Sequence, residues 1–288
     1  MEKEVTFPSE GLKLSGVLHT PDGMKASDKR PGFLLLPGFG GTKSGAGAQF
    51  VGGKFAEWGY AALRFDQRGC GDSEGEYGRI LCQNQVADTR NALTWLAEQK
   101  GVDGTRIAVQ GSSFGGAVAV YTAGVDERVA AVISCGGWGD GERKFKGQHP
   151  GPEKWKKFTD MLAEGRRHRE ATGQSLMVPR YDIVPIPGHL RGNVNPKGHM
   201  EFPAETAQSM FDFRADEVVA NIAPRPLLLF HPAKDSVTST EQSVEMFKRA
   251  GQPTELILMA GVDHFTFSDD NPRPMQAIKS WLDAYFPA

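Results

Sequence analysis

Short apolar segments and amphipathic segments alternate along most of this 288-residue chain. Residues 5–23 alternate apolar and polar positions around turn residues, which predicts an antiparallel hairpin. Four apolar runs follow, each bounded by glycine or a polar turn, and such runs are typical of strands buried on both faces of a parallel sheet. They span residues 32–38, 60–66, 106–111 and 129–137, and two further strands are expected at 226–231 and 254–261.

Segments with a helical period of apolar residues separate these strands. In residues 79–99 the apolar positions recur at roughly the spacing of one helix face. Strands that alternate with helices predict an α/β fold with a mostly parallel sheet, over a single domain of residues 1–288. The other helices are expected at residues 115–124, 239–250 and 274–285.

The alternation is interrupted between residues 138 and 215. This stretch is rich in Pro, Gly and charged residues, and only one helix is expected in it, near 152–170. Residues 140–191 carry 11 Lys or Arg and 7 Asp or Glu, a balance of +4, so the rest of the chain carries −6 of the net charge of −2. We interpret 138–215 as a cap inserted into the domain. Its basic balance favours an anionic substrate, since a cleft lined by one charge attracts the other; the alternative is a set of solvated surface charges.

The composition narrows the class of protein. With 39% hydrophobic and 24% charged residues the chain is typical of a globular protein, and its near-zero net charge argues against a nucleic-acid partner. No apolar run approaches the roughly 18 residues of a membrane span, so no membrane association is expected. The first residues lack a secretory signal pattern, and the three cysteines are too scattered for a disulfide framework or a metal cluster. We therefore expect a cytoplasmic protein without metal or cofactor, of unknown oligomeric state.

The strongest chemical signal is the sequence Gly111-Ser112-Ser113-Phe114-Gly115. It has the form G-x-S-x-G and lies between a predicted buried strand and a predicted helix. In that context the chain must turn sharply, which exposes the central serine at the start of the helix. We predict that Ser113 is a nucleophile. A Cys70 nucleophile is the weaker alternative, because Cys70 does not lie between a strand and a helix.

A serine nucleophile needs a base, and the base needs a carboxylate that fixes its tautomer. His264 follows the predicted strand 254–261, and Asp235 follows the strand 226–231. Loops after the strands of a parallel sheet meet at one edge, so we predict that these two residues complete a catalytic triad with Ser113. His231 is the alternative base, and Asp263 the alternative acid.

An oxyanion hole is expected beside the serine. The backbone N–H of Phe114, which follows the nucleophile, should supply one donor. The glycine-rich segment 37-PGFGG-41 follows the first buried strand, and the N–H of Phe39 should supply the other.

These motifs resemble those of the α/β-hydrolase superfamily, over nearly the whole chain outside the insert. The triad order Ser113, Asp235, His264 is that of the superfamily. The turn 64-RFDQRGCGDSEG-75 is similar to a turn of many esterase and peptidase-like members, and the nearest likeness is to the cinnamoyl/feruloyl-esterase-like and acylaminoacyl-peptidase-like branches. Two features depart from the pattern: Pro37-Gly38 stands where many members have His-Gly, and the insert matches no familiar lid.

The sequence therefore predicts a serine hydrolase that cleaves a small or medium carboxylic ester through an acyl-enzyme. The triad alone also fits an amidase, a short-peptide hydrolase or a carbon–carbon bond hydrolase. A non-catalytic ligand-binding member of the superfamily is a further alternative. Trp138 and Tyr181, or the neighbouring Arg180, are candidate substrate contacts in the insert, and Trp138 fits a packed aromatic under the cap equally well.

Overall fold

The computed structural model describes residues 1–195, 198–267 and 271–288. Its centre is an eight-stranded sheet in the order β1-β2-β4-β3-β5-β6-β9-β10. Strands β1 and β2 form an antiparallel hairpin, β2 pairs antiparallel with β4, and every later pair in the sheet is parallel. The strands are β1 (Glu2–Ser9), β2 (Leu12–His19), β3 (Arg30–Leu36), β4 (Ala61–Phe65), β5 (Val102–Ser112), β6 (Val129–Cys135), β9 (Leu227–Pro232) and β10 (Thr254–Met259).

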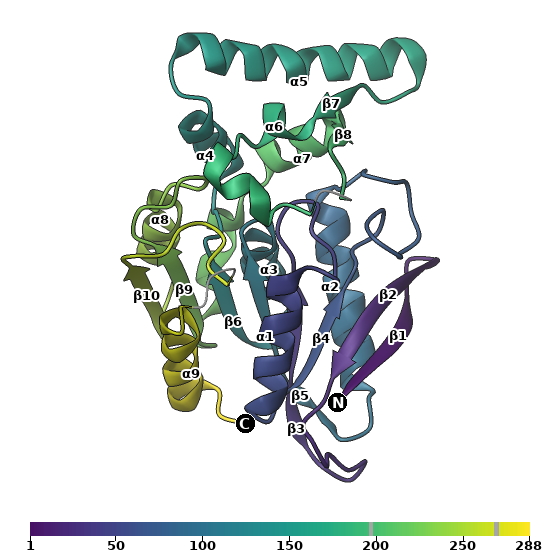
Figure 1. Cartoon of the computed structure of the whole chain (residues 1–288), viewed down its shortest axis with the longest axis vertical. Coiled ribbons are helices and arrows are strands. Elements are labelled where there is room, and N and C mark those ends of the chain that lie inside the picture. Colours follow the sequence, from purple (N-terminus) through teal and green to yellow (C-terminus); the bar gives the residue numbers. More distant parts are fainter. Residues whose placement is uncertain (196–197, 268–270) are drawn as a thin grey trace.

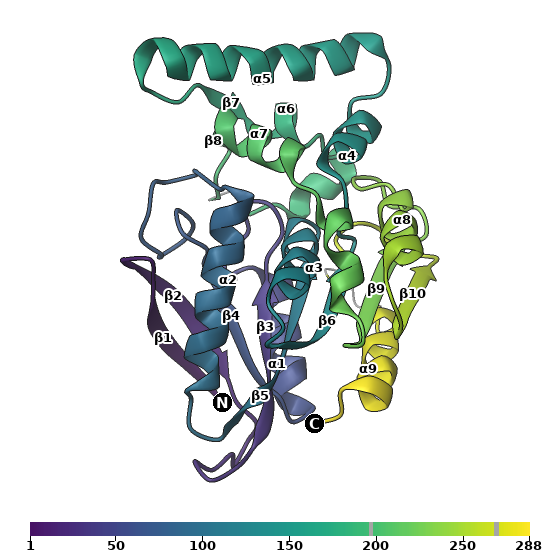
Figure 2. The same cartoon turned by 180° about the vertical axis from the view of Figure 1, so that it is seen from behind.

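Helices cover both faces of the sheet (Figures 1 and 2). Helices α1 (Ala46–Glu57) and α9 (Arg273–Tyr285) share one apolar cluster with one face. Helices α2 (Cys82–Ala97), α3 (Phe114–Val125) and α8 (Glu241–Arg249) contribute to the cluster on the other face. The central strands are apolar because both of their faces are buried by these helices. The predicted α/β fold and its mostly parallel sheet are confirmed.

Most of the segment between β6 and β9 forms a group of helices at one end of the molecule, with α5 outermost (Figure 1), and its last turns, before β9, pack against α3. Helix α5 (Pro152–Thr172) begins at a proline and ends at Gly173 in the left-handed region, and it matches the helix expected near 152–170. We call residues 138–215 the insert. The other elements of the segment are α4 (Gly141–Gln148), β7 (Met177–Pro179), α6 (Arg180–Ile183), η1 (Gly188–Asn193), β8 (Glu201–Pro203), α7 (Ala204–Asp212), η2 (Ala215–Glu217) and η3 (Val219–Ile222).

The expectation of a single helix in the insert is wrong. Helix α7 was missed because its buried face consists mainly of small residues, Ala204, Thr206 and Ala207, with one large residue, Met210. Helix α6 has only four residues and begins directly after Pro179, so it gives no periodic signal. Both helices owe their stability to packing against other parts of the chain.

The residues that the structure describes contain neither a membrane-spanning helix nor a cluster of metal ligands. No helix in residues 1–195, 198–267 and 271–288 is both long enough and apolar enough to cross a membrane. In the same residues no three His, Cys, Asp or Glu side chains lie together in a way that could hold a metal ion.

Candidate active site

Ser113 lies on a sharp turn between β5 and α3. Its backbone has φ 54° and ψ −114°, a conformation that side-chain-bearing residues rarely adopt. The flanking glycines permit it: a Cβ on Gly111 would lie 2.0 Å from the carbonyl oxygen of Gly115, and a Cβ on Gly115 would lie 2.4 Å from that of Leu36. The turn therefore requires glycine on both sides of the serine and holds its half-buried side chain beyond the end of β5.

Three side chains from separate loops meet at this turn. The Oγ atom of Ser113 lies 2.8 Å from Nε2 of His264, which follows β10. The other ring nitrogen of His264, Nδ1, lies 2.8 and 2.9 Å from the two carboxylate oxygens of Asp235, which follows β9. The structure thus brings together the three residues that the sequence singled out, because β5, β9 and β10 run parallel and end at the same edge of the sheet.

The Asp235 carboxylate is wholly buried and firmly held. Its Oδ1 accepts hydrogen bonds from the main-chain N–H groups of Val237, at 2.8 Å, and Thr238, at 2.7 Å. Burial alone would raise its pKa, but the neighbouring His264, which is hydrogen-bonded to it, and the nearby His231 outweigh burial and lower the pKa below its usual range. The aspartate is therefore ionised at neutral pH and suited to hold a proton on Nδ1 of His264.

The alternative acid and base make other contacts. Asp263 accepts hydrogen bonds from the N–H and Oγ of Ser236 and from the main-chain N–H of His264, so its contact is with the backbone and not the ring. His231 is buried at the end of β9, with Nδ1 2.7 Å from Ser243 Oγ and Nε2 3.0 Å from the carbonyl of Thr238. Its Nε2 also lies 3.5 Å from Oδ2 of Asp235.

Cys70, the alternative nucleophile, is buried, and burial raises the pKa of its thiol to about 12. A thiol with such a pKa is protonated at neutral pH and inert. Its position does not support a catalytic role.

The segment predicted to supply an oxyanion donor packs against the serine turn. A Cβ on Gly38 would lie 3.5 Å from the Cβ of Ser113. The rings of Phe39 and Phe114 meet edge to face, with centroids 6.2 Å apart. Among the described residues, neither the N–H of Phe39 nor that of Phe114 donates to another backbone group in a turn or loop. The first N–H groups of a helix have no partner within it, so Phe114 offers a free donor next to Ser113.

The two candidate substrate contacts differ in accessibility. Trp138 is fully buried, its ring stacked 6.1 Å from that of Phe114 and packed edge to face on Phe213. Tyr181 is partly buried in α6, and the guanidinium of Arg191 lies 4.1 Å from its ring centroid. Their contact with a substrate stays a prediction, and the packing of Trp138 matches its interpretation as an aromatic under the insert.

One pair of residues, which joins two loops beside the site, was not predicted from the sequence. Asp66, just after β4, accepts hydrogen bonds from the main-chain N–H of Lys43 at 2.6 Å and from its ammonium at 2.9 Å. Both side chains are buried, and the Lys43 ammonium also pairs with Asp72. This ion pair fixes the loop after β3, which carries Phe39, to the turn after β4. A contact between a buried lysine and a buried aspartate 23 residues apart cannot be predicted before the fold is known.

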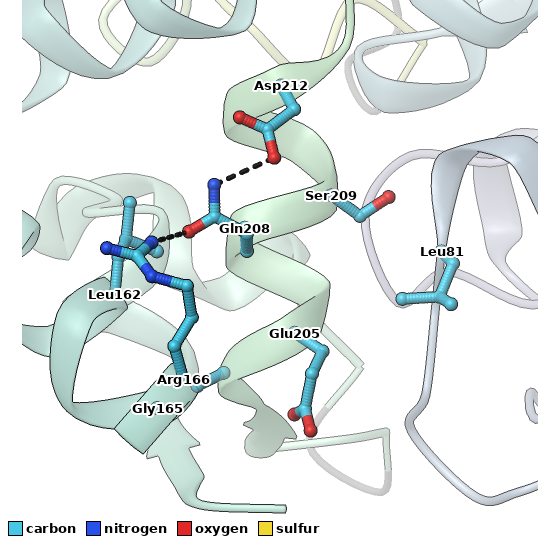
Figure 3. Close-up of a pocket in the computed structure, with 9 residues that line it drawn as sticks. Leu81, Leu162, Gly165, Arg166, Glu205, Gln208, Ser209 and Asp212 are labelled. Atoms are coloured by element: carbon cyan, nitrogen blue, oxygen red, sulfur yellow. Dashed lines mark hydrogen bonds between the residues drawn. The ribbon is translucent and has the colours of Figure 1, made fainter. Parts of the chain in front are cut away.

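A pocket of about 250 Å³ lies away from these residues, between α5, α7 and the segment before α2 (Figure 3). Leu81, Leu162 and Ala204 supply its apolar wall. On its rim Gln208 accepts a hydrogen bond from Arg166 and donates one of 2.7 Å to Asp212. None of Ser113, Asp235 and His264 lines this pocket, so it is distinct from the candidate active site.

The strand order, the serine turn and the loops that follow the parallel strands define an α/β-hydrolase fold. The chain belongs to the family described as serine aminopeptidase, S33 (Hydrolase_4), whose model matches residues 28–271. The resemblance to the α/β-hydrolase superfamily is therefore confirmed, and the protein belongs to a hydrolase family.

Individual relatives and solved structures are similar to this protein over most of its length. An uncharacterized 31.7 kDa protein of Escherichia coli is 26% identical over 264 residues, which are 89% of each chain. The polyketide transferase grgF of a Penicillium species is 27% identical over 266 residues, 88% of this chain and 86% of that protein. Its crystal structure matches with a TM-score of 0.81 over 99% of both chains, at 23% identity. Est1E of Butyrivibrio proteoclasticus, solved with ferulic acid bound, matches with a TM-score of 0.70 over 98% of both chains, at 18% identity.

Proposed function

We propose that the protein is a serine hydrolase that cleaves a small or medium carboxylic ester through an acyl-enzyme. One observation carries the proposal: the continuous hydrogen-bonded line from Ser113 Oγ through His264 to the buried Asp235 carboxylate. A protein that only binds a ligand does not require these hydrogen bonds, whereas a serine nucleophile depends on them for its activation.

In the proposed reaction Ser113 Oγ attacks the ester carbonyl carbon while Nε2 of His264 takes its proton. The carbonyl electron pair moves onto oxygen, and the N–H groups of Phe39 and Phe114 stabilise the resulting oxyanion. The tetrahedral intermediate collapses, the ester C–O bond breaks, and His264 returns the proton to the leaving alcohol. Asp235 keeps the proton of the imidazole on Nδ1 throughout and stabilises the imidazolium.

Water then attacks the acyl-enzyme, with His264 again acting as base, and releases the carboxylic acid and free Ser113. The insert is proposed to act as a cap over this site and to shape the acyl or alcohol pocket, with Tyr181 as a candidate contact. An amide or a carbon–carbon bond is the alternative target, since the same three residues serve those reactions.

A second candidate function is acyl transfer. The observation that favours it is the sequence similarity over 88% of the chain to a protein named polyketide transferase grgF. An alcohol or amine would then replace water in the attack on the acyl-enzyme, and the product would be a new ester or amide. The two functions share the acyl-enzyme and differ only in the group that removes the acyl chain.

Labelling and turnover together test the proposal. A fluorophosphonate probe should label wild-type protein at Ser113, and purified protein should hydrolyse members of a panel of esters that vary in acyl size and charge. Ser113→Ala should lose labelling and at least about 10³-fold of the rate. The matched control is Ser112→Ala, because the Oγ of Ser112 accepts a hydrogen bond of 3.2 Å from Gln110 and does not face His264. Turnover that survives in pure Ser113→Ala protein would exclude the proposed nucleophile.

The same panel separates the alternatives. A matched ester and amide would show which bond is preferred. Addition of an alcohol or amine acceptor would divert the acyl group to a new product only if transfer competes with hydrolysis. Anionic and neutral esters that are hydrolysed equally well would exclude the interpretation of the basic insert as a determinant of substrate charge.

A further inference from the structure

Arg180 is a buried cation that joins the insert to the loop after β3. It is the first residue of α6, and only 6% of its surface is exposed. Its Nη2 donates a hydrogen bond to the main-chain carbonyl of Phe39, and its Nη1 donates one of 3.2 Å to that of His199. The guanidinium also lies over two aromatic rings, 5.1 Å from the centroid of Phe39 and 5.7 Å from that of Phe202.

This arginine has no anionic partner in the part of the chain that the structure describes. No Asp or Glu oxygen of those residues lies within 4.0 Å of it. By contrast, the two half-buried arginines of the insert, Arg143 and Arg214, are each paired with a carboxylate. Its Nε is buried without a hydrogen-bond partner. A buried charge without a counter-ion is destabilising, so packing alone does not account for an arginine here.

The geometry around Phe39 leaves little freedom to this loop. The Phe39 ring lies 4.3 Å from that of Phe202 and is covered by the guanidinium. Gly40 follows with φ 61°, and a Cβ on it would lie 2.7 Å from Nη1 of Arg180 and 2.8 Å from Cζ of Phe202. The hydrogen bond to the Phe39 carbonyl fixes the plane of the 39–40 peptide. With the ring and the carbonyl both held, the Cα of Phe39 and the position of its backbone nitrogen are fixed, which restricts the directions open to its N–H.

We propose that Arg180 is a positioning residue for the oxyanion hole: from the insert, it holds Phe39 so that the N–H of this residue points to the oxygen of the tetrahedral intermediate. This inference rests on the proposed function, which assigns that N–H to the oxyanion. Donors of an oxyanion hole act only when their direction is fixed before the charge develops. The position of the insert would thereby control the rate of the chemical step and not only access to the site.

Arg180→Ala and Arg180→Lys test the proposal, with Arg191→Ala as the matched control. Arg191 lies in the same insert, bonds to the carbonyl of Ile186 and stacks on Tyr181, and has no contact with Phe39. Loss of one oxyanion donor typically lowers kcat by about 10²–10³, so a misdirected donor should lower it by about 10–10². We expect kcat to fall to this extent in Arg180→Ala with KM nearly unchanged. The affinity for an alkylboronic acid, which forms an oxyanion-like adduct on the serine, should fall by a similar factor.

Lysine keeps the charge but cannot bridge the two carbonyls, so Arg180→Lys should recover only part of kcat. Added guanidinium should partly restore kcat in Arg180→Ala and leave Arg191→Ala unchanged. Circular dichroism and thermal melting identify any variant that fails to fold; the judgement then rests on Arg180→Lys, which keeps the aliphatic chain and the charge.

The results separate this proposal from the one on which it rests. If the fluorophosphonate does not label Ser113 in wild-type protein, the proposed function fails and the role of Arg180 fails with it. If wild type is labelled and a folded Arg180 variant keeps the wild-type kcat and boronate affinity, only the positioning role is overturned. A rise in KM with kcat unchanged also overturns it, because that result would make Arg180 a substrate contact.

Discussion

Nδ1 of His264 lies 2.8 Å from Oδ2 of Asp235, and the carboxylate that it faces is completely buried. Asp235→Asn preserves the shape of this contact but replaces an acceptor with an amide that can donate to Nδ1. The imidazole then carries its proton on Nε2, where it can no longer accept the proton of Ser113. We expect kcat to fall by about 10³–10⁴ with little change in KM, measured with the best ester of the panel.

Asp263→Asn is the matched control for this substitution. Asp263 is adjacent to His264 but accepts from its main-chain N–H, so its change should lower kcat by less than about 10-fold. If Asp263→Asn lost more activity than Asp235→Asn, the roles of the two carboxylates would have to be exchanged.

Substitutions of the two histidines near Asp235, His264 and His231, should differ sharply in their effect on activity. His264→Gln removes the group that faces Ser113 Oγ and should lower kcat by at least about 10³-fold. His231→Gln alters a ring that contacts Ser243 and Thr238, so we expect a loss of about 10-fold through looser placement of Asp235. Rates of fluorophosphonate labelling measure both effects. Equal losses in both variants would contradict the assignment of His264 as the base.

The sequence could predict the sheet and the meeting of Ser113, Asp235 and His264 because each of these residues lies within a few positions after the end of a strand with a strong apolar signal. Parallel strands end at one edge, so strand order in the chain was enough to bring the loops together. Helix α1 escaped the prediction because glycines interrupt its apolar face, and its close contact with β2 explains one of them: a Cβ on Gly52 would lie 2.6 Å from His19.

Arg180 and Lys43 show the limit of such prediction. Lys43 lies in a glycine-rich polar loop and Arg180 in a mostly apolar segment with several prolines, and neither pattern by itself indicates a buried cation. Their burial depends on contacts with residues distant in the chain: Phe39 and His199 for Arg180, and Asp66 for Lys43. No local pattern encodes such contacts, which appear only when the insert and the loops after β3 and β4 are folded together.

Gly111→Ala should disrupt the serine turn. The added methyl would lie 2.0 Å from the carbonyl oxygen and 2.2 Å from the carbonyl carbon of Gly115, both of them backbone atoms that cannot move without displacing α3. We expect the free energy of unfolding to fall by roughly 3 kcal/mol or more, and fluorophosphonate labelling to be lost. Urea unfolding followed by circular dichroism measures the first effect.

Gly147→Ala is the control for this substitution. Gly147 lies in α4, with nothing within 4 Å of an added Cβ, so alanine there should be neutral or stabilising by up to about 1 kcal/mol. A Gly111→Ala protein as stable and as readily labelled as Gly147→Ala would show that the turn tolerates a side chain and that its close packing is not required.

Lys144 in α4 should make the stability of the protein depend on pH. Its side chain is buried, its ammonium donates a 2.7 Å hydrogen bond to Gln148, and the ring centroids of Phe145 and Trp138 lie 3.9 and 5.7 Å away. Burial lowers its pKa from 10.5 to about 7. Between these two values the unfolded chain binds the proton and the folded protein does not, so stability from this group rises with pH across that window. Below about pH 7 both states are protonated, and the full cost of the buried charge is present.

Lys144→Met removes the charge and keeps the length of the side chain, so it should stabilise the protein most at pH 6 and progressively less toward pH 10. Each pKa unit corresponds to about 1.4 kcal/mol, which sets an upper limit of about 5 kcal/mol for the gain at pH 6, reduced by the lost hydrogen bond to Gln148. Urea unfolding of both proteins at pH 6, 8 and 10 measures the contribution of Lys144 together with its electrostatic effect on Cys82 and His149, whose pKa values the ammonium lowers. Lys146→Met, on the exposed side of the same helix, should show no such trend. A difference between Lys144→Met and wild type that is constant with pH would mean that the Lys144 ammonium carries no burial penalty.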